Sequence, residues 1–529
     1  MDRRSFLKGS MGASLLSGIP AEIFAQTPVS PSASNWDSGE LVHLLPTVND
    51  REILIKASFL VPQDAQPVLR VGSNRVEGQL NDSTGRFWQF HARDLEPGRD
   101  YELSLRGARN SLLCEPWNLR TFPAFNASPE RLRALFFTCA GGRESTNRIS
   151  HATRNRLLNR GLSFQPDIAL ANGDHVYWDL HSPRTSGGTN GAARRDRTAG
   201  TFDESALIFG NDNETVLKLA AGTQITPIYG TDFRSTPVFF LQDDHDYFDN
   251  DEATDEAVTF PPTWFMIQLA RATQRMYYPE FLADNFRPLN LPWSSLEDRN
   301  PGLSESYGTV RFGQLAEIAL YDVRRTMTLR GPTAVFINPE IEKWLMNRAA
   351  ATDVNHFVHV PSNPPGWSAG KWGEWYPDIL NDNGELTTSI QKPYWQQGWL
   401  SQHDRLMNSL SSREDRIPLV ISGDLHAIAL GQIERSGSLD FTRNPINAVL
   451  CGPIGTGPGG WPSAFRGVGP SVPNHLDLRQ QILPLEQHGF TLVDFLPDRI
   501  LLQFFSYLEE DPIESIDTLE PFYVTELAH

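Results

Sequence analysis

Four short motifs that carry metal-ligand side chains each follow directly after an apolar run. They are Cys139, Gly173-Asp174 with Tyr177, Asp243-Asp244-His245, and Gly423-Asp424-Leu425-His426. A short run of buried apolar residues is typical of a strand, and the residues after such strands lie at a sheet edge, where open clefts form. The sequence therefore predicts an α/β fold with one metal cluster at the ends of several strands.

Length and charge limit the class of protein. With 529 residues, the chain is longer than one hydrophobic core usually accommodates, so at least two domains are expected. The formal net charge of −18 argues against a protein that binds nucleic acid through a basic footprint. The three cysteines are too few for a disulfide framework. An anionic substrate would therefore need local positive charge from metal ions and arginine.

The N-terminus has the features of an export signal. The chain begins with MDRRSFLK, and a weakly apolar stretch follows from Ser10 to Ile19. This resembles a twin-arginine signal peptide over residues 1–26, with cleavage near Ala25. The apolar stretch is about half of the roughly 20 residues that a membrane span needs, so no span is expected. We expect the twin-arginine machinery to export the protein to the periplasm or the extracellular space.

The first folded part of the chain is predicted to be all-β. Residues 27–38 form a polar, proline-bearing linker. Over residues 39–124, short β-rich runs alternate with turn signals, which predicts a small β-sandwich. The segment Leu95–Tyr101 resembles the corner of an immunoglobulin-like or fibronectin-like domain, where a tyrosine pins the turn. No catalytic residue stands out here, so we interpret the domain as a support.

The rest of the chain predicts a catalytic α/β domain over residues 131–508. Longer apolar strands there alternate with helical or irregular segments. The runs 490–495 and 499–505 predict a hairpin that closes the second sheet of a sandwich. The tail, residues 509–529, is acidic with interspersed apolar residues, and is either a docking arm or a frayed terminus.

Two segments without periodicity look inserted into this domain. They are His181–Asn213, rich in glycine and arginine, and His359–Trp399, which contains five tryptophans. Long loops without secondary structure in a compact domain are often lids or walls of a site. Both segments are therefore candidates for substrate selection.

Two of the motifs resemble elements of the metallophosphoesterase superfamily. The Gly-Asp-x-x-Tyr pattern at Asp174 and Tyr177 resembles a motif in which the aspartate bridges two metal ions. The run at 243–246 resembles the Gly-Asn-His-Glu/Asp element. By that resemblance, Asp244 takes the place of the asparagine as a metal ligand, and His245 points at the phosphate.

The remaining motifs narrow the resemblance to one branch. The run ending at His426 resembles Gly-His-x-His, with Asp424 in place of the first histidine, and alternate residues of an extended segment share a face. In most members of the superfamily the first motif along the chain is Asp-x-His, whereas this chain has Cys139 at that place. Together with Tyr-Asp-Val-Arg at 321–324, the motifs resemble the alkaline phosphatase D, or PhoD-like, family. That resemblance implies a layered sandwich of two sheets flanked by helices, with a small β domain before it.

The donor set indicates two different metals. The predicted metal ligands are Cys139, Asp174, Tyr177, Asp244, Asp424 and His426. A thiolate and a phenolate are strong anionic donors that suit Fe³⁺, whereas a site of aspartate oxygens suits Ca²⁺ or another hard cation. Fe³⁺ beside Ca²⁺ is therefore the expected pair, with other divalent metals as alternatives. The competing interpretation is that Cys139 and Tyr177 are ordinary buried core residues.

The expected activity is phosphate ester hydrolysis. A metal pair lowers the pKa of bound water and neutralises phosphate charge. His245 would stabilise the phosphoryl oxygens or protonate the leaving alkoxide, and Arg324 or Arg325 would clamp a phosphate oxygen. The sequence does not separate phosphomonoesters from phosphodiesters. Two other classes stay open: a non-catalytic metal-binding surface or adhesion protein, and a metal hydrolase of a non-phosphorus ester.

Overall fold

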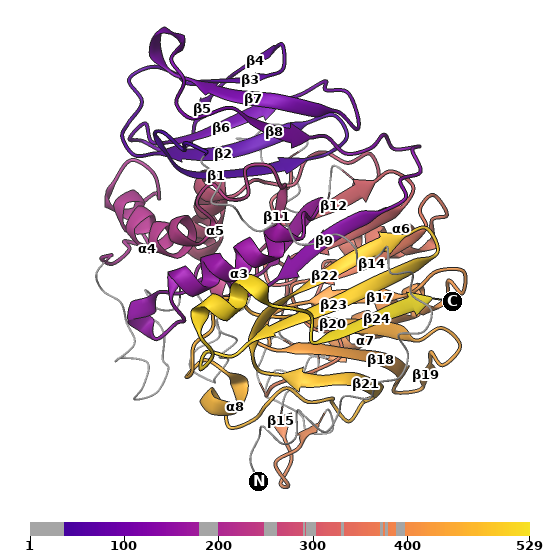
Figure 1. Cartoon of the computed structure of the whole chain (residues 1–529). Helices are drawn as coiled ribbons and strands as arrows, with labels where there is room; N and C mark the ends of the chain where they lie inside the picture. The colour runs from indigo at the N-terminus through magenta and orange to yellow at the C-terminus, as the bar shows by residue number, and fades with distance from the viewer. Residues whose placement is uncertain are drawn as a thin grey trace.

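The computed structural model places a small all-β domain on a larger layered α/β domain (Figure 1). The structure describes residues 36–178, 199–247, 262–288, 291, 303–328, 333–370, 374–375, 379–387 and 397–528. The expected signal peptide lies outside these residues, as do residues 27–35 of the linker and a large part of the predicted insertion His181–Asn213. No helix among the described residues is long and apolar enough to cross a membrane.

The N-terminal domain is a sandwich of two four-stranded antiparallel sheets, with strand orders β1-β2-β6-β5 and β4-β3-β7-β8. Its strands are β1 (Leu41–Val48), β2 (Ile53–Phe59), β3 (Val68–Val71), β4 (Asn74–Glu77), β5 (Gln79–Leu80), β6 (Phe87–Ala92), β7 (Asp100–Arg106) and β8 (Trp117–Arg120), with the short 3-10 helix η1 (Ala108–Asn110) before β8. The backbone N–H of Glu96 donates to the Tyr101 hydroxyl oxygen at 2.8 Å, so the expected tyrosine corner is present.

The first sheet of the catalytic domain has the order β11-β10-β9-β22-β23-β24. Its strands are β9 (Leu132–Phe137), β10 (Ile168–Asn172), β11 (Val238–Leu241), β22 (His488–Leu496), β23 (Arg499–Tyr507) and β24 (Tyr523–Ala528). β9, β10 and β11 are parallel, and every residue in them is buried, which is why they appear in the sequence as unbroken apolar runs.

The second sheet has the order β12-β13-β14-β17-β20-β18-β19, and β21 also pairs with β18. Its strands are β12 (Tyr307–Phe312), β13 (Ala316–Tyr321), β14 (His356–Pro361), β17 (Leu419–Ser422), β18 (Ile428–Ser436), β19 (Leu439–Asp440), β20 (Ile446–Cys451) and β21 (Leu476–Leu485). A separate two-stranded ladder joins β15 (Ile379–Leu380) to β16 (Leu386–Thr387). The parallel neighbours β13, β14, β17 and β20 form the centre of the second sheet.

Helices cover the outer face of each sheet. The helices are α3 (His151–Ser163), α4 (Asp212–Tyr229), α5 (Trp264–Tyr277), α6 (Pro339–Ala350), α7 (Gln397–Ser411) and α8 (Pro462–Phe465), with 3-10 turns η2 (Glu144–Thr146), η5 (Asp244–Tyr247) and η6 (Ile513–Thr518). One apolar cluster joins α3, α4 and α5 to the first sheet, and another joins α6 and α7 to the second. The order is therefore helix, sheet, sheet, helix, as predicted.

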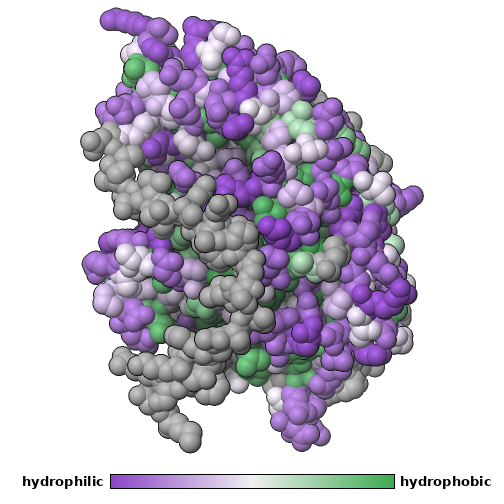
Figure 2. Space-filling view, turned by 45° about the vertical axis from the view of Figure 1, so that its right-hand side comes forward, coloured by the Kyte–Doolittle hydropathy of each residue, from purple (hydrophilic) through white to green (hydrophobic). Residues whose placement is uncertain are grey.

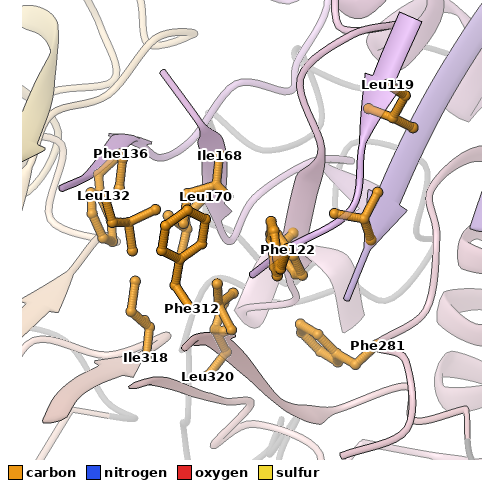
Figure 3. Close-up of a cluster of buried hydrophobic side chains, with 14 of the residues drawn as sticks. Leu119, Phe122, Leu132, Phe136, Ile168, Leu170, Phe281, Phe312, Ile318 and Leu320 are labelled. Atoms are coloured by element: carbon orange, nitrogen blue, oxygen red, sulfur yellow. The ribbon is translucent and has the colours of Figure 1, made fainter. Parts of the chain in front are cut away.

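The apolar layer between the two sheets continues into the β domain (Figure 3). Phe122 lies at the junction, with its ring centre 6.1 Å from that of Phe239 and 5.4 Å from that of Phe312. A fully buried charge pair adds to this interface, since the ammonium of Lys56 in β2 lies 2.9 Å from a carboxylate oxygen of Glu280. The β domain is thus packed firmly against the catalytic domain. On the face in Figure 2, hydrophilic residues predominate and hydrophobic ones form small separate groups.

Two predictions about the C-terminal part of the chain need correction. The hairpin β22–β23 exists, but it completes the first sheet beside β9 and not the second. The residues after 508 do not extend away from the domain: η6 packs against α3, and β24 pairs antiparallel with β23 as the edge strand (Figure 1). The segment therefore belongs to the fold of the catalytic domain.

Three tryptophans of the predicted insertion His359–Trp399 have a structural role. Trp367, Trp375 and Trp399 are buried in the core behind the second sheet. Phe336 stacks on Trp375 with ring centres 4.1 Å apart and meets Trp399 edge-on at 5.0 Å. Large aromatic rings contribute to stability through such burial. These three side chains are therefore part of the core, whereas Trp372 and Trp395 lie outside the described residues.

A buried histidine at the domain interface predicts acid sensitivity. His43 in β1 is fully buried beside Tyr277 of α5, and burial lowers the pKa of His43 to about 3 from its usual 6.5. Between these two pH values only the unfolded chain binds the proton, so stability is lost as the pH falls through this window. We expect His43→Leu to flatten the dependence of the unfolding free energy on pH by about 1.4 kcal/mol per pH unit. Urea unfolding at several pH values measures this slope. An unchanged slope in the variant would mean that His43 is not the source of the acid sensitivity.

Candidate metal centre

The motif residues lie at the carboxyl ends of strands from both sheets. Cys139 follows β9, Asp174 follows β10, Asp244 follows β11 and Asp424 follows β17. Cys139, Asp174, Asp424 and His426 all have positive φ, between 50° and 70°. Such a backbone costs of order 1 kcal/mol or more per residue and is typical of functional sites, where the surrounding structure imposes it. The fold therefore holds these four side chains in place at a cost in stability.

Four predicted ligands form the first half of the cluster. The Cys139 thiol lies 3.3 Å from Oδ2 of Asp174, and the Tyr177 hydroxyl lies 3.2 Å from the same oxygen. The Tyr177 oxygen is also 3.2 Å from Nε2 of His426. Ligand atoms of Cys139, Asp174 and His426 all lie within 4.8 Å of one another. A thiol, a carboxylate, a phenol and an imidazole thus converge on one point.

Carboxylates form the second half of the cluster. Oxygens of Asp243, Asp244 and Asp424 lie within 4.8 Å of one another, and all three residues are buried. Arg324 lies among them, with its Nε 2.6 Å from Oδ1 of Asp243 and an Nη 3.3 Å from Oδ2 of Asp424. The side-chain amide of Asn363 lies 3.4 Å from the same Asp424 oxygen. This half offers oxygen donors, which hard cations prefer.

Asp174 joins the two halves. Besides its contacts with Cys139 and Tyr177, its carboxylate forms a third possible ligand group with Asp244 and His245. The glycine before it permits this geometry, because Gly173 has φ +81° and a Cβ there would lie 2.6 Å from Cβ of Asp243. The Asp174 carboxylate is therefore placed where a bridge between two cations would need it.

A glycine-rich loop at residues 452–460 orients the histidine ligand. Nδ1 of His426 lies 2.6 Å from the carbonyl oxygen of Gly460, so this nitrogen carries the proton and donates it. The other nitrogen, Nε2, is then left as a lone-pair donor toward the cluster, an arrangement typical of metal-bound histidine. Gly455 lets the loop approach, because a Cβ there would lie 2.6 Å from the carbonyl oxygen of Cys139.

The two predicted catalytic residues, His245 and Arg324, lie at the cluster. The side chains of their neighbours Arg325 and His175 are bonded to other parts of the protein. The half-exposed ring of His245 lies 4.1 Å from that of Tyr177, centre to centre. In contrast, the guanidinium of Arg325 bonds Glu305 at 2.9 Å in a buried network. His175 turns into the core, where its Nε2 lies 2.8 Å from the carbonyl oxygen of Leu241.

Electrostatics favour bound cations. Burial, followed by the charges of neighbouring acids, raises the pKa of Cys139 and Tyr177 well above their usual values, and burial likewise raises the pKa of Asp174 and Asp243. Among the described residues, Oδ1 of Asp174 and Oδ2 of Asp243 are buried without a hydrogen-bond partner. Buried acids that raise each other's pKa and retain unused oxygens are expected where metal ions offset the charge. The donor set therefore fits a transition metal beside a hard cation.

The structure brings all six predicted ligands together, and it adds residues that the motifs did not single out. The motif that contains Asp243 predicts no role for this residue, whereas its carboxylate lies in the cluster and pairs with Arg324. Asn363 lies two residues after β14, in a stretch with no recognisable motif. The one available signal was its position after an apolar strand that neighbours β17.

Two solved structures have a fold similar to that of this chain. The chain is similar to PhoD, with a TM-score of 0.58 and 14% identity over 89% of this chain and 87% of that protein. It is also similar to a purple acid phosphatase from yellow lupin (Lupinus luteus) seeds, with a TM-score of 0.54 and 11% identity over 93% of this chain and 74% of the lupin enzyme. No protein-family model and no curated sequence matches it. The fold prediction is confirmed: this chain has the layered two-sheet fold of PhoD and of the lupin purple acid phosphatase, with an all-β domain before it.

Proposed function

We propose that this protein is an exported, metal-dependent phosphoric ester hydrolase. The observation that carries the proposal is the single buried cluster in which Asp174 joins the Cys139, Tyr177 and His426 donors to the aspartate group. The fold shared with PhoD and purple acid phosphatase supports phosphate as the reacting group. The twin-arginine sequence at residues 1–8 supports export to the periplasm or the extracellular space.

The donors support Fe³⁺ in the first half of the cluster and Ca²⁺ in the second. Cys139 and Tyr177 would supply anionic sulfur and oxygen to Fe³⁺, which neutral or weaker donors would hold less well. Asp244 and Asp424 offer oxygens suited to Ca²⁺ or another hard divalent ion, and Asp174 would serve both. When bound, such a pair of cations supplies positive charge for the phosphate oxygens and lowers the pKa of water.

The protein's own residues orient the ester and handle the leaving group. The half-exposed imidazole of His245, beside Asp174 and Asp244, can donate a proton to the departing alkoxide or a hydrogen bond to a phosphoryl oxygen. Arg324 is fully buried and pairs with Asp243 and Asp424, so we propose that it offsets the charge of these carboxylates and does not clamp a phosphate oxygen. Strands from two packed sheets fix these groups, which keeps them aligned through the reaction.

Metal analysis with two model esters tests the proposal. We expect purified protein to contain iron, to absorb visible light through thiolate and phenolate coordination, and to hydrolyse p-nitrophenyl phosphate or bis-p-nitrophenyl phosphate. EGTA should reduce the rate, and added Ca²⁺ should restore it. Zinc as the sole metal would overturn the iron assignment, and absence of turnover on both esters would overturn the function.

The Cys139 thiol provides a residue-level test. We expect Cys139→Ser to lose the visible absorption and to lower kcat/KM by about a hundredfold or more, because a ligand contributes at least as much as the groups that support it. Cys114→Ser is the matched control, since Cys114 is also a buried free thiol but lies in the β domain. Iron content and absorption retained in the Cys139 variant would contradict its assignment as a ligand.

A further inference from the structure

Arg148 is a cation beside the metal centre for which the reaction above has no role. Its guanidinium carbon lies 4.4 Å from the ring centre of Tyr177, whose hydroxyl contacts Asp174. The side chain is half-exposed, and its Nε is buried without a hydrogen-bond partner among the described residues. A positive group of this kind, next to a buried anionic cluster, is suited to bind an anion that arrives from outside.

The loops around the centre are shaped to seat this side chain. A Cβ on Gly142 would lie 2.5 Å from Cγ of Arg148, and a Cβ on Gly460 would lie 2.7 Å from one of its Nη atoms. The aliphatic part of the Arg148 side chain therefore passes over Gly142, and its guanidinium lies over Gly460. Gly460 also accepts the hydrogen bond of His426, so the guanidinium lies beside two of the predicted ligands.

Nearby arginines are engaged with the protein itself. Arg154 donates to three backbone carbonyl oxygens of the loop after Cys139, at 2.7 to 3.0 Å. Arg143 donates to the carbonyl oxygen of Leu219, and Arg324 pairs with Asp243. Within the described part of the chain, the guanidinium of Arg148 forms no such bond.

We infer that Arg148 binds a phosphate oxygen of the substrate, and that it favours phosphomonoesters. This rests on the proposed phosphate ester hydrolysis. A monoester has three non-bridging oxygens, so one is left over for a guanidinium when two face the cluster, whereas a diester has only two. A charge-assisted hydrogen bond from Arg148 would therefore select the monoester dianion over the diester.

A comparison of two esters tests the inference. We expect Arg148→Gln to lower kcat/KM for p-nitrophenyl phosphate by about ten- to a hundredfold, the equivalent of one charged hydrogen bond, and to affect bis-p-nitrophenyl phosphate far less. Calorimetry with inorganic phosphate should show a similar loss of affinity. Arg148→Lys should recover part of it. Arg156→Gln is the matched control, because Arg156 is paired with Asp517 at the surface of α3.

The remaining outcomes overturn the inference. An equal loss on both esters, or a loss of metal or of visible absorption in Arg148→Gln, would assign Arg148 to positioning Tyr177. Unchanged kinetics and unchanged phosphate affinity would leave Arg148 without a role in binding. Failure of the proposed function is separate, because it would appear as absence of turnover in the unaltered protein.

Discussion

Asp174→Asn is expected to abolish turnover while leaving the metal-free protein at least as stable. Asp174 contacts Cys139 and Tyr177 and also forms a ligand group with Asp244 and His245, so both halves of the cluster depend on it. Loss of a carboxylate that would hold both cations would remove several kcal/mol of charge stabilisation, which corresponds to a fall in kcat/KM of about a thousandfold or more.

Stability should change in the other direction. Burial, and the charges of neighbouring aspartates, raise the pKa of Asp174 well above its usual value, although His245 opposes this shift. Without metal, an amide at this position relieves repulsion, so the thermal midpoint of chelated protein should stay the same or rise. Asp477→Asn, at an exposed position in β21, is the control. Retained metal content and turnover in the Asp174 variant would contradict the bridging assignment.

The strands that bear the site were predictable because they are buried on both faces. β9, β10, β11 and β17 appear as short apolar runs, and the residue types after each run identify the chemistry. The sequence therefore located the residues of the candidate metal centre from their place after strands. It could not give the positive φ of Cys139, since such a conformation is imposed by the packed loop and not by the residue itself.

Features that depend on pairing between distant segments were beyond the sequence. The pairing of β14 with β17 brings Asn363 to the Asp424 carboxylate, and no local pattern reports it. The sequence does not indicate that β24 is a strand, because its side chains are half-exposed or exposed and it has no buried apolar run. The burial of Trp375 and Trp399 was also beyond the sequence, because the segment around them has no periodicity that indicates a buried face.

Asp246→Asn is the second change with a large expected effect, and it acts on stability. One carboxylate oxygen of Asp246 accepts the backbone N–H groups of Asp174 and Asp243, each at 3.0 Å. The other accepts those of His175 and Val176, also at 3.0 Å. This single side chain therefore ties the loop after β10 to the loop after β11, and these loops carry half of the predicted ligands.

An amide cannot reproduce that arrangement in either orientation. Whichever way the side chain of Asp246→Asn lies, its NH₂ faces two backbone donors, which are left buried and unsatisfied. Each such group costs about 1–3 kcal/mol, so urea unfolding should show a loss of about 2–6 kcal/mol. Metal content should fall as well, since Asp174 and Asp244 lose their common anchor. Asp440→Asn, at the exposed end of β19, controls for the substitution itself. A fully stable Asp246 variant with normal metal content would mean that the two loops are held by the strands alone.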